Sequence, residues 1–225
     1  MDDLNKKALG GLLRFLIILA VLLFLPVWTL RYWQAWIFLF VFSACALATS
    51  LYVMKNDPKL LERRMRAGPR AEKERSQQII QSVAAAAFIA LLLFPPLDHR
   101  FGWSAVPWFM VVAGDVLVAV GFLIIFFVFR ENGFASGVIE VSDGQKVVAT
   151  GPYALVRHPM YAGALVMLIG VPLALGSRWG SLMVIPIALV IVWRLLDEER
   201  FLAKNLSGYS DYRNKVRHRL LPFLW

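Results

Sequence analysis

A cluster of ionisable and hydroxyl-bearing side chains stands at the start of an apolar stretch in the C-terminal half of the chain. It lies within the motif GPYALVRHPMYAG and contributes Tyr153, Arg157, His158 and Tyr161. Gly-Pro favours a turn whose backbone groups can face a ligand, and Pro159 suits the first turn of a helix. The positive end of such a helix favours a carboxylate or a phosphate. Taken alone, Arg157 and His158 are more typical of interfacial anchors than of ligands.

A second cluster lies at the far end of the following apolar stretch, within the motif WRLLDEER. Arg194 and Glu198 are four residues apart, so a helix stacks them on one face. One interpretation is an exposed ion pair worth roughly a few tenths of a kcal/mol. The other is that Arg194 presents its planar fork to a substrate carboxylate, while Glu198 holds Arg194 or binds an ammonium group. The second cluster alone favours the ion pair, and Glu199 is expected to be the less constrained neighbour.

These clusters belong to a chain that is too apolar for a soluble domain. Of its 225 residues, 59% are hydrophobic and only 17% are charged, whereas soluble domains carry about 25% charged residues. Apolar runs near the ~20 residues that cross a bilayer predict an all-α, polytopic membrane protein with about six transmembrane helices. The last two are expected to form a tight helical hairpin. The predicted spans are Leu9–Leu30, Tyr32–Met54, Ile79–Leu97, Ala105–Phe129, Met160–Ser177 and Ser181–Leu196.

The distribution of the net charge of +9 indicates membrane orientation rather than nucleic-acid binding. Lys and Arg are abundant in residues 55–75 and 194–225, whereas the intervening turns hold only Arg31, Arg100 and Arg178. This alternation is the positive-inside pattern for a chain with both ends in the cytoplasm, and the basic loops suit anionic lipid headgroups. We therefore expect a multi-pass integral membrane protein in contact with the bilayer, with no nucleic-acid partner.

Several further features bear on the chemistry. Cys45 is the single cysteine and the histidines are scattered, so no metal site is predicted. Asp115 is an intramembrane carboxylate for which we favour a structural over a catalytic role. Asp57-Pro58 predicts the start of a short helix, with Asp as its cap. The polar stretch 130–150 is long for a connection between spans, as lids and binding loops often are.

The order of the motifs resembles a known family. GPY-x-x-VRHP-x-Y, a short apolar hairpin, R-x-x-x-E-E and Tyr-x-x-Tyr are similar to the isoprenylcysteine carboxyl methyltransferases, and related phospholipid methyltransferases share much of the pattern. The resemblance covers Val138–Trp225. It implies S-adenosylmethionine as cofactor in a cytoplasmic pocket without a Rossmann domain, which agrees with the absence of a G-x-G-x-x-G motif. The implied division is into N-terminal transmembrane helices, 1–129, and a methyltransferase-like cofactor-binding region, 130–225.

The same resemblance implies roles for individual residues. Arg194 and Glu198 are the implied catalytic residues; Arg194 would bind and orient the acceptor, and Glu198 would also contact the cofactor. The family often has His where Gln145 stands. The residues implied to wrap the cofactor are Gln145, Lys146, Val147, Val148, Tyr153, His158, Pro159, Met160 and Tyr161.

The implied cofactor determines which acceptors need catalytic help. A sulfonium methyl group is already activated, so the protein mainly has to align nucleophile, carbon and sulfur. A carboxylate acceptor needs no general base because it is ionised at neutral pH, whereas an amine acceptor would need Glu198 or Glu199 as proton acceptor.

The leading hypothesis is therefore methyl transfer to a lipidic or membrane-partitioned acceptor, with a prenylcysteine-type carboxylate placed first. The first alternative is a phospholipid N-methyltransferase. The second is an NADPH-dependent sterol-type membrane reductase, whose C-terminal half resembles this topology, and the third is a non-catalytic membrane scaffold. The sequence does not distinguish a prenylated cysteine from an isoprenoid acid or an aminophospholipid, and it leaves the oligomeric state open.

Overall fold

The computed structural model describes residues 2–72, 74–222 and 225, and every regular element in this part of the chain is a helix. The all-α class predicted from the sequence is therefore confirmed. The elements in chain order are α1 (Asp2–Phe24), α2 (Trp33–Asn56), α3 (Pro58–Met65), η1 (Pro69–Ala71), α4 (Arg75–Phe101), α5 (Trp108–Glu131), η2 (Gly151–Ala154), α6 (Pro159–Ala174), η3 (Trp179–Met183), α7 (Val184–Asn205) and α8 (Tyr209–Lys215).

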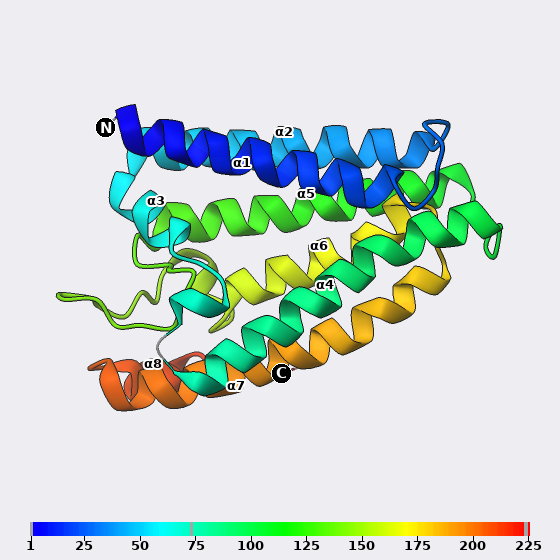
Figure 1. Cartoon of the computed structure of the whole chain (residues 1–225). Coiled ribbons are helices and arrows are strands. Elements are labelled where there is room, and N and C mark those ends of the chain that lie inside the picture. Colours follow the sequence, from blue (N-terminus) through cyan, green and yellow to red (C-terminus); the bar gives the residue numbers. More distant parts are fainter. Residues whose placement is uncertain (1, 73, 223–224) are drawn as a thin grey trace.

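The long helices lie side by side and run back and forth between two ends of the molecule (Figure 1). The connections α1–α2, α4–α5 and α6–α7 lie at one end. The short helices α3 and α8 gather at the other, together with the segment 132–158 between α5 and α6. We call this second end the polar end. Segments far apart in the sequence therefore meet there.

Within the described part of the chain, five helical segments are long and apolar enough to cross a membrane: Asp3–Phe24, Trp33–Asn56, Arg75–Phe101, Trp108–Glu131 and Trp179–Asn205. The predicted span Met160–Ser177 corresponds to α6, which is apolar but has only 16 residues. At ~1.5 Å per residue it reaches about 24 Å, short of the ~30 Å hydrocarbon core. Length and composition thus support five spans, and a sixth remains a prediction.

The helices α5 and α6 approach each other closely because glycines line their contact. A Cβ atom on Gly121 would lie 2.6 Å from the carbonyl oxygen of Gly163, and one on Gly170 would lie 2.5 Å from that of Gly114. A Cβ atom on Gly114 would collide with the backbone of Ala174. Small residues allow such backbone approach between membrane helices. This packing holds α6, and therefore its N-terminus, at a defined place beside α5.

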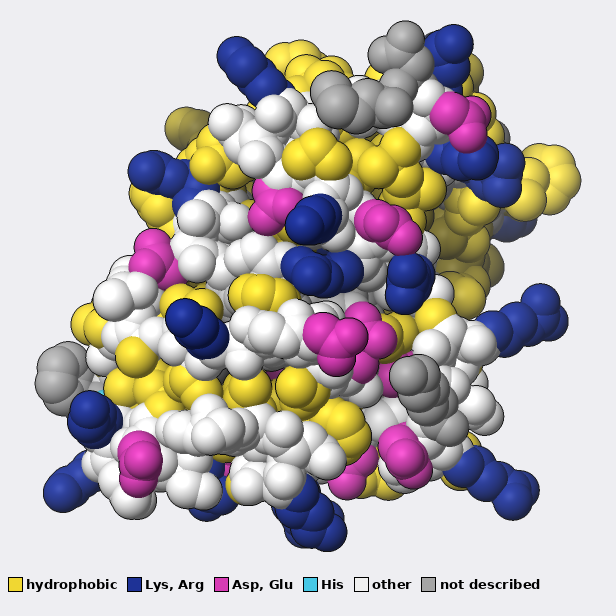
Figure 2. Space-filling model, turned by 90° about the vertical axis from the view of Figure 1, so that its left-hand side faces the viewer, with side chains coloured by type: hydrophobic (Ala, Val, Ile, Leu, Met, Phe, Trp, Pro, Cys, Tyr) yellow, Lys and Arg dark blue, Asp and Glu magenta, His cyan; other side chains and the backbone are white. Residues whose placement is uncertain are grey.

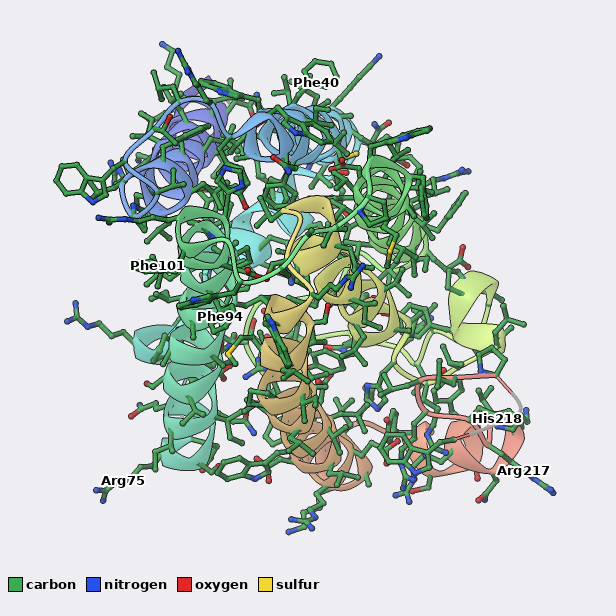
Figure 3. The ribbon with its side chains drawn as sticks, turned by 90° about the vertical axis from the view of Figure 1, so that its right-hand side faces the viewer. Phe40, Arg75, Phe94, Phe101, Arg217 and His218 are labelled. Carbon is green, nitrogen blue, oxygen red and sulfur yellow. The ribbon has the colours of Figure 1, made fainter. Side chains whose placement is uncertain are left out.

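Large apolar side chains face outward as well as inward. Phe40 on α2 is 74% exposed and points away from the bundle (Figure 3), and Leu189 on α7 is 66% exposed. Phe38 on α2 and Leu91 on α4 are buried in the hydrophobic core. An apolar exterior of this kind suits a bundle that is surrounded by lipid.

The end opposite the polar end is tied together by Asp98, which is fully buried near the end of α4. Its carboxylate accepts a hydrogen bond from the backbone N–H of Ser104 at 2.8 Å and from the hydroxyls of Ser104 and Ser177. The Ser177 hydroxyl in turn accepts from the N–H of Gly180. These contacts link the α4–α5 and α6–α7 connections.

Asp115 lies on α5 directly after Gly114, where the backbone of α6 comes close. It is 6% exposed, and neither carboxylate oxygen has a hydrogen-bond partner within the described part of the chain. It lies in the first half of α5, whereas the last residues of this helix lie at the polar end. Asp115 is therefore remote from the polar end. The structural role favoured from the sequence stays a prediction.

Candidate functional site

A pocket opens at the polar end between the segment 132–158, the start of α6, the end of α7 and α8. Figure 2 shows this end of the molecule, where Lys, Arg, Asp and Glu side chains are spread over the surface between apolar patches. The empty space of the pocket and its mouth, open solvent included, is about 880 Å³. The lining is contributed by Asn132, Phe134, Ala135, Ser136, Val138, Ile139, Glu140, Gln145, Lys146, Val147, Val148, Tyr153, Arg157, His158, Pro159, Met160, Tyr161, Arg194, Glu198, Leu202, Leu206, Tyr209 and Tyr212.

All the site residues predicted from the sequence lie around this one pocket. They come from three separate parts of the chain: 145–153, 158–161 and 194–198. The structure therefore brings together residues that the motif pattern places in one site. Which of them contact a cofactor or an acceptor remains a prediction.

Tyr161 lies between the two residues Arg194 and Glu198. Its hydroxyl donates a hydrogen bond to Glu198 Oε2 at 2.6 Å and accepts one from Arg194 Nε at 3.1 Å. The simple ion pair between Arg194 and Glu198 that their spacing suggested is not found among the ion pairs of the described residues. The first turn of α6 therefore connects the two functional candidates on α7.

Residues at and just before the start of α4 also bind the Arg194 side chain. Its Nη2 donates to Glu72 Oε1 at 2.8 Å and to the carbonyl oxygen of Gly137 at 3.3 Å, while Nη1 donates to Gln77 Oε1 at 2.9 Å. The Arg194 side chain is only 12% exposed, and that of Glu72 is 1% exposed. The guanidinium is thus a largely buried, multiply bonded group, and it lines the pocket with few of its N–H donors unused.

Arg157 and His158 face the protein interior and not the headgroup level. Arg157 Nε lies 2.7 Å from Glu199 Oε1, His158 Nε2 lies 3.3 Å from the same oxygen, and Arg219 Nε lies 3.0 Å from Glu199 Oε2. Arg157, His158 and Glu199 are all buried. The expectation that Glu199 is the less constrained neighbour of Glu198 is wrong, because this carboxylate is the centre of a buried charge network.

The C-terminal segment pairs with the turn that leads into α6. The backbone N–H groups of Arg157 and His158 donate to the carbonyl oxygens of His218 and Arg219, each at 2.9 Å. Arg157 Nη1 also donates to the carbonyl oxygen of Val216 at 3.1 Å. These bonds fix the chain just before α6, so the C-terminal tail helps to position the first turn of that helix.

Aromatic residues form one part of the pocket wall. Tyr212 and Tyr209 on α8 pack with Val147 and Tyr153, and the Tyr212 hydroxyl donates to the carbonyl oxygen of Tyr153 at 2.8 Å. Asn132 donates to the Tyr153 hydroxyl at 2.9 Å. Burial raises the pKa of Tyr153 to about 12 and raises that of Tyr209 and Tyr212 as well, so these hydroxyls stay protonated at neutral pH.

The hydroxyl of Tyr209 is an orphan in this wall. Tyr209 is 4% exposed and lines the pocket, and its hydroxyl oxygen has no hydrogen-bond partner within the described residues. A buried polar group without a partner is unfavourable unless a ligand or water satisfies it. Because Tyr209 lines the pocket, its hydroxyl is a candidate donor to a bound ligand.

Sequence reasoning missed three residues that build the site, Glu72, Gln77 and Asn132, and it did not foresee the buried ion pairs of Glu199. Glu72 and Gln77 reach Arg194 across more than a hundred positions of sequence, so no local spacing could reveal the contact. Asn132 follows the end of α5, where a polar residue is unremarkable. For metals, no group of three or more potential ligands is found among the residues that the structure describes.

Comparisons with known proteins agree with the motif pattern. The family model described as "Phospholipid methyltransferase" matches residues 109–208. The proteins named "Probable protein-S-isoprenylcysteine O-methyltransferase" from Oryza sativa subsp. indica and subsp. japonica are each 31% identical over 157 residues, which cover 64% of this chain and 77% of theirs. A "Delta(14)-sterol reductase TM7SF2" from Mus musculus is 27% identical over 105 residues, covering 43% of this chain and 25% of that protein.

The reductase similarity covers only 25% of that protein, whereas the methyltransferase similarity covers 77% of the rice proteins. The chain is a methyltransferase with several apolar helices suited to a membrane, and it belongs to the family of the isoprenylcysteine and phospholipid methyltransferases.

Proposed function

We propose that this membrane methyltransferase transfers the methyl group of S-adenosylmethionine to the carboxylate of a lipidic or lipidated acceptor of the prenylcysteine type. The observation that carries the proposal is the Tyr161 bridge, which brings Arg194 and Glu198 together in a pocket that is lined by polar as well as apolar and aromatic side chains. The names of the rice relatives support the acceptor class.

The pocket suits the cofactor in the kinds of groups that it presents. Glu198 and Glu140 line it beside the cations of Lys146, Arg157 and Arg194 and beside apolar and aromatic side chains. S-adenosylmethionine is partly apolar and carries both positive and negative groups, so it matches this mixed lining. The unpartnered hydroxyl of Tyr209 would donate to one of its polar groups. Gln145, Lys146, Pro159 and Met160 would complete the enclosure, as the family resemblance implies.

The protein's part in the reaction is to hold and orient. When bound, the cofactor supplies an activated methyl group, whose C–S bond breaks with its electron pair going to sulfur as the acceptor oxygen forms the new O–C bond. Arg194 would orient the acceptor carboxylate by a hydrogen bond, and Glu198 would hold the amino group of the cofactor through charge attraction. No proton has to move, because a carboxylate is already ionised at neutral pH.

An amine acceptor is the second candidate, and the match to the phospholipid methyltransferase model favours it. A protonated amine must lose a proton before it can attack, so the site would have to accept one. Glu198 lines the pocket and would serve, whereas Glu199 is engaged by Arg157 and Arg219. Activity on an aminophospholipid that is lost in Glu198→Gln would support this alternative.

The proposed orientation has the pocket facing the cytoplasm. The polar end carries the Lys- and Arg-rich residues 55–75 and the basic tail after α7, which is the side that the positive-inside rule places in the cytoplasm. In this arrangement α6 is a shortened sixth span that forms a hairpin with α7. We also propose residues 130–225 as the cofactor-binding region, since every lining residue falls within it.

The test is calorimetric titration of the detergent-purified chain with S-adenosylhomocysteine, followed by methyl transfer to N-acetyl-S-farnesylcysteine and to an aminophospholipid. Glu198→Gln should lose most of the affinity, whereas Asp211→Asn, an exposed change on nearby α8, should bind like the wild type. Well-folded wild-type protein that does not bind S-adenosylhomocysteine would overturn the proposal. Binding with transfer to the amine alone would replace the carboxylate by the second candidate.

A further inference from the structure

Glu72 lies just before α4 and outside the pocket lining, yet both of its carboxylate oxygens are engaged by groups at the pocket. Oε1 accepts from Arg194 Nη2 at 2.8 Å and from Gln81 Nε2 at 3.2 Å. Oε2 accepts from the backbone N–H of Ile139 at 3.2 Å. Ile139 lines the pocket, so this single carboxylate connects α4, the pocket segment and the arginine on α7.

Gln77, in the first turn of α4, completes the attachment. It is 2% exposed; its Oε1 accepts from Arg194 Nη1 at 2.9 Å, and its Nε2 donates to the carboxylate of Asp197. Gln77 therefore joins two residues of α7 that are three positions apart. The orientation of the Arg194 side chain is consequently determined largely by the N-terminal half of the chain.

These contacts use nearly all the hydrogen-bonding capacity of Arg194. Nε donates to Tyr161, the two Nη2 hydrogens serve Glu72 and the carbonyl oxygen of Gly137, and Nη1 gives one hydrogen to Gln77. From the inventory of guanidinium donors, one Nη1 hydrogen is left. Arg194 can then offer an acceptor a single hydrogen bond but not the bidentate fork that arginine usually presents to a carboxylate.

A neutralised arginine suits the proposed reaction better than a bare one. The acceptor carboxylate loses negative charge as its oxygen bonds to the methyl carbon. A strong, unpaired cation would therefore stabilise the bound acceptor more than the transition state and slow the transfer. Glu72 reduces the net positive charge that the acceptor meets, while Glu72 and Gln77 together keep the remaining N–H in place.

We propose that Glu72 is a positioning residue of the methyl transfer: it acts through Arg194, holding the guanidinium at the pocket with one donor free and its charge compensated. The proposal rests on the proposed carboxylate acceptor for the charge argument. Its geometric part, the fixing of Arg194 by Glu72 and Gln77, does not depend on the acceptor.

The test compares Glu72→Gln and Gln77→Met with Glu62→Gln in the full chain purified in detergent. Glu62 is a matched control because it is a glutamate on the neighbouring helix α3 whose side chain is 59% exposed. It pairs with Arg66, the residue that follows this helix. Each variant is titrated with S-adenosylhomocysteine, melted thermally, and assayed with N-acetyl-S-farnesylcysteine as acceptor. The N–H signal of Arg194 Nε is followed by NMR of ¹⁵N-arginine-labelled protein and assigned with Arg194→Lys.

In Glu72→Gln we expect kcat to fall by about tenfold or more, since small misplacements at a reacting centre have effects of that order. KM for the acceptor should stay the same or fall, because the Arg194 guanidinium, no longer compensated by the charge of Glu72, binds the ground-state carboxylate more tightly. The Kd for S-adenosylhomocysteine should stay within about twofold of the wild type. Gln77→Met should change kcat in the same direction by less, and Glu62→Gln should match the wild type.

A kcat in Glu72→Gln equal to that of the control, or a raised KM at unchanged kcat, would overturn the kinetic part of the proposal. The Arg194 Nε signal should be sharp and slow to exchange in the wild type and in Glu62→Gln, and broadened in Glu72→Gln. An identical signal in all three proteins would overturn the positioning itself. If the wild type binds S-adenosylhomocysteine but methylates only an amine, the acceptor class and the charge argument fail together, and the NMR comparison still decides whether Glu72 positions Arg194.

Discussion

The hydroxyl of Tyr161 lies 2.6 Å from Oε2 of Glu198, and the same hydroxyl accepts a hydrogen bond from Arg194. Tyr161 belongs to the first turn of α6, whereas Glu198 and Arg194 lie one turn apart on α7. At the polar end, the two helices are thus connected by hydrogen bonds that link three side chains. The geometry of that chain decides where a positive and a negative group meet the pocket.

Tyr161→Phe removes this link without changing the ring. We expect kcat to fall by about tenfold, because Arg194 and Glu198 lose their common partner and each becomes less well oriented. Affinity for S-adenosylhomocysteine should weaken by only a few-fold, because the lost hydrogen bonds join protein groups to each other and reach the ligand only through Glu198. Steady-state kinetics and calorimetry check both values. Tyr52→Phe, on α2 against Phe126, is the matched control, and equal activity of the two variants would contradict the role of the bridge.

The two tyrosines of α8 should respond differently to the same substitution. Tyr212 donates a hydrogen bond within the protein, to the carbonyl oxygen of Tyr153, whereas the buried Tyr209 hydroxyl has no partner in the described residues. Tyr212→Phe should therefore lower the stability of the ligand-free protein by about 1 kcal/mol. Tyr209→Phe should leave that stability unchanged or raised and should weaken S-adenosylhomocysteine binding instead.

Thermal melting with and without S-adenosylhomocysteine separates the two effects, since a ligand that binds only the folded state raises its melting temperature by an amount that grows with its affinity. Tyr209→Phe should show a smaller ligand-induced rise than the wild type. A full rise in that variant would exclude its hydroxyl from the binding site.

Glu199 is expected to be among the most sensitive positions for stability. Its side chain is 5% exposed and contacts Arg157, Arg219 and His158. Glu199→Gln leaves Arg157 buried without a compensating charge, which typically costs about 3–5 kcal/mol. Denaturant unfolding in detergent measures the change. The exposed pair of Lys7 and Asp3 supplies the comparison, because Asp3→Asn should change stability by less than about 1 kcal/mol.

The close contact between α5 and α6 should not tolerate a larger residue at Gly121. A Cβ there would lie 2.6 Å from both the Gly163 carbonyl oxygen and the Met167 Cβ, so Gly121→Ala should destabilise the protein by about 1–3 kcal/mol through overpacking. Gly11→Ala on α1 meets open space and should be neutral or slightly stabilising. Melting temperatures of the two variants provide the measurement, and equal values would show that the helices separate at little cost.

Alkaline pH should weaken the protein through Tyr153. Burial raises its pKa from 10.0 to about 12, so the folded state disfavours the phenolate relative to the unfolded chain. The corresponding stability is fully present below pH 10 and is lost as the pH rises toward 12. Tyr153→Phe should flatten this part of the stability–pH curve, measured by denaturant unfolding between pH 9 and pH 12. The same slope in both proteins would contradict the raised pKa.

The local chemistry of the sequence was sufficient for much of the architecture. The Asp57-Pro58 start of α3 is confirmed, with Asp57 accepting from the backbone N–H of Leu60 at 2.9 Å, because a helix cap depends on neighbouring residues alone. The apolar runs indicated membrane helices for a similar reason. The ordered motifs around Tyr153, His158 and Arg194 pointed to one site, and the methyltransferase family is confirmed.

By itself, then, the sequence determined the class of the helices, the family and a part of the residues around the pocket. Only the tertiary structure decided which side chains meet: Glu199 with Arg157, and Arg194 with Glu72 and Gln77 rather than with Glu198 directly. The physical reason is the separation in sequence between the residues that interact. Helix starts and apolar periodicity follow from neighbours within a few positions, whereas these buried partners are 42 to 122 positions apart and are selected by how the glycine-lined helices pack.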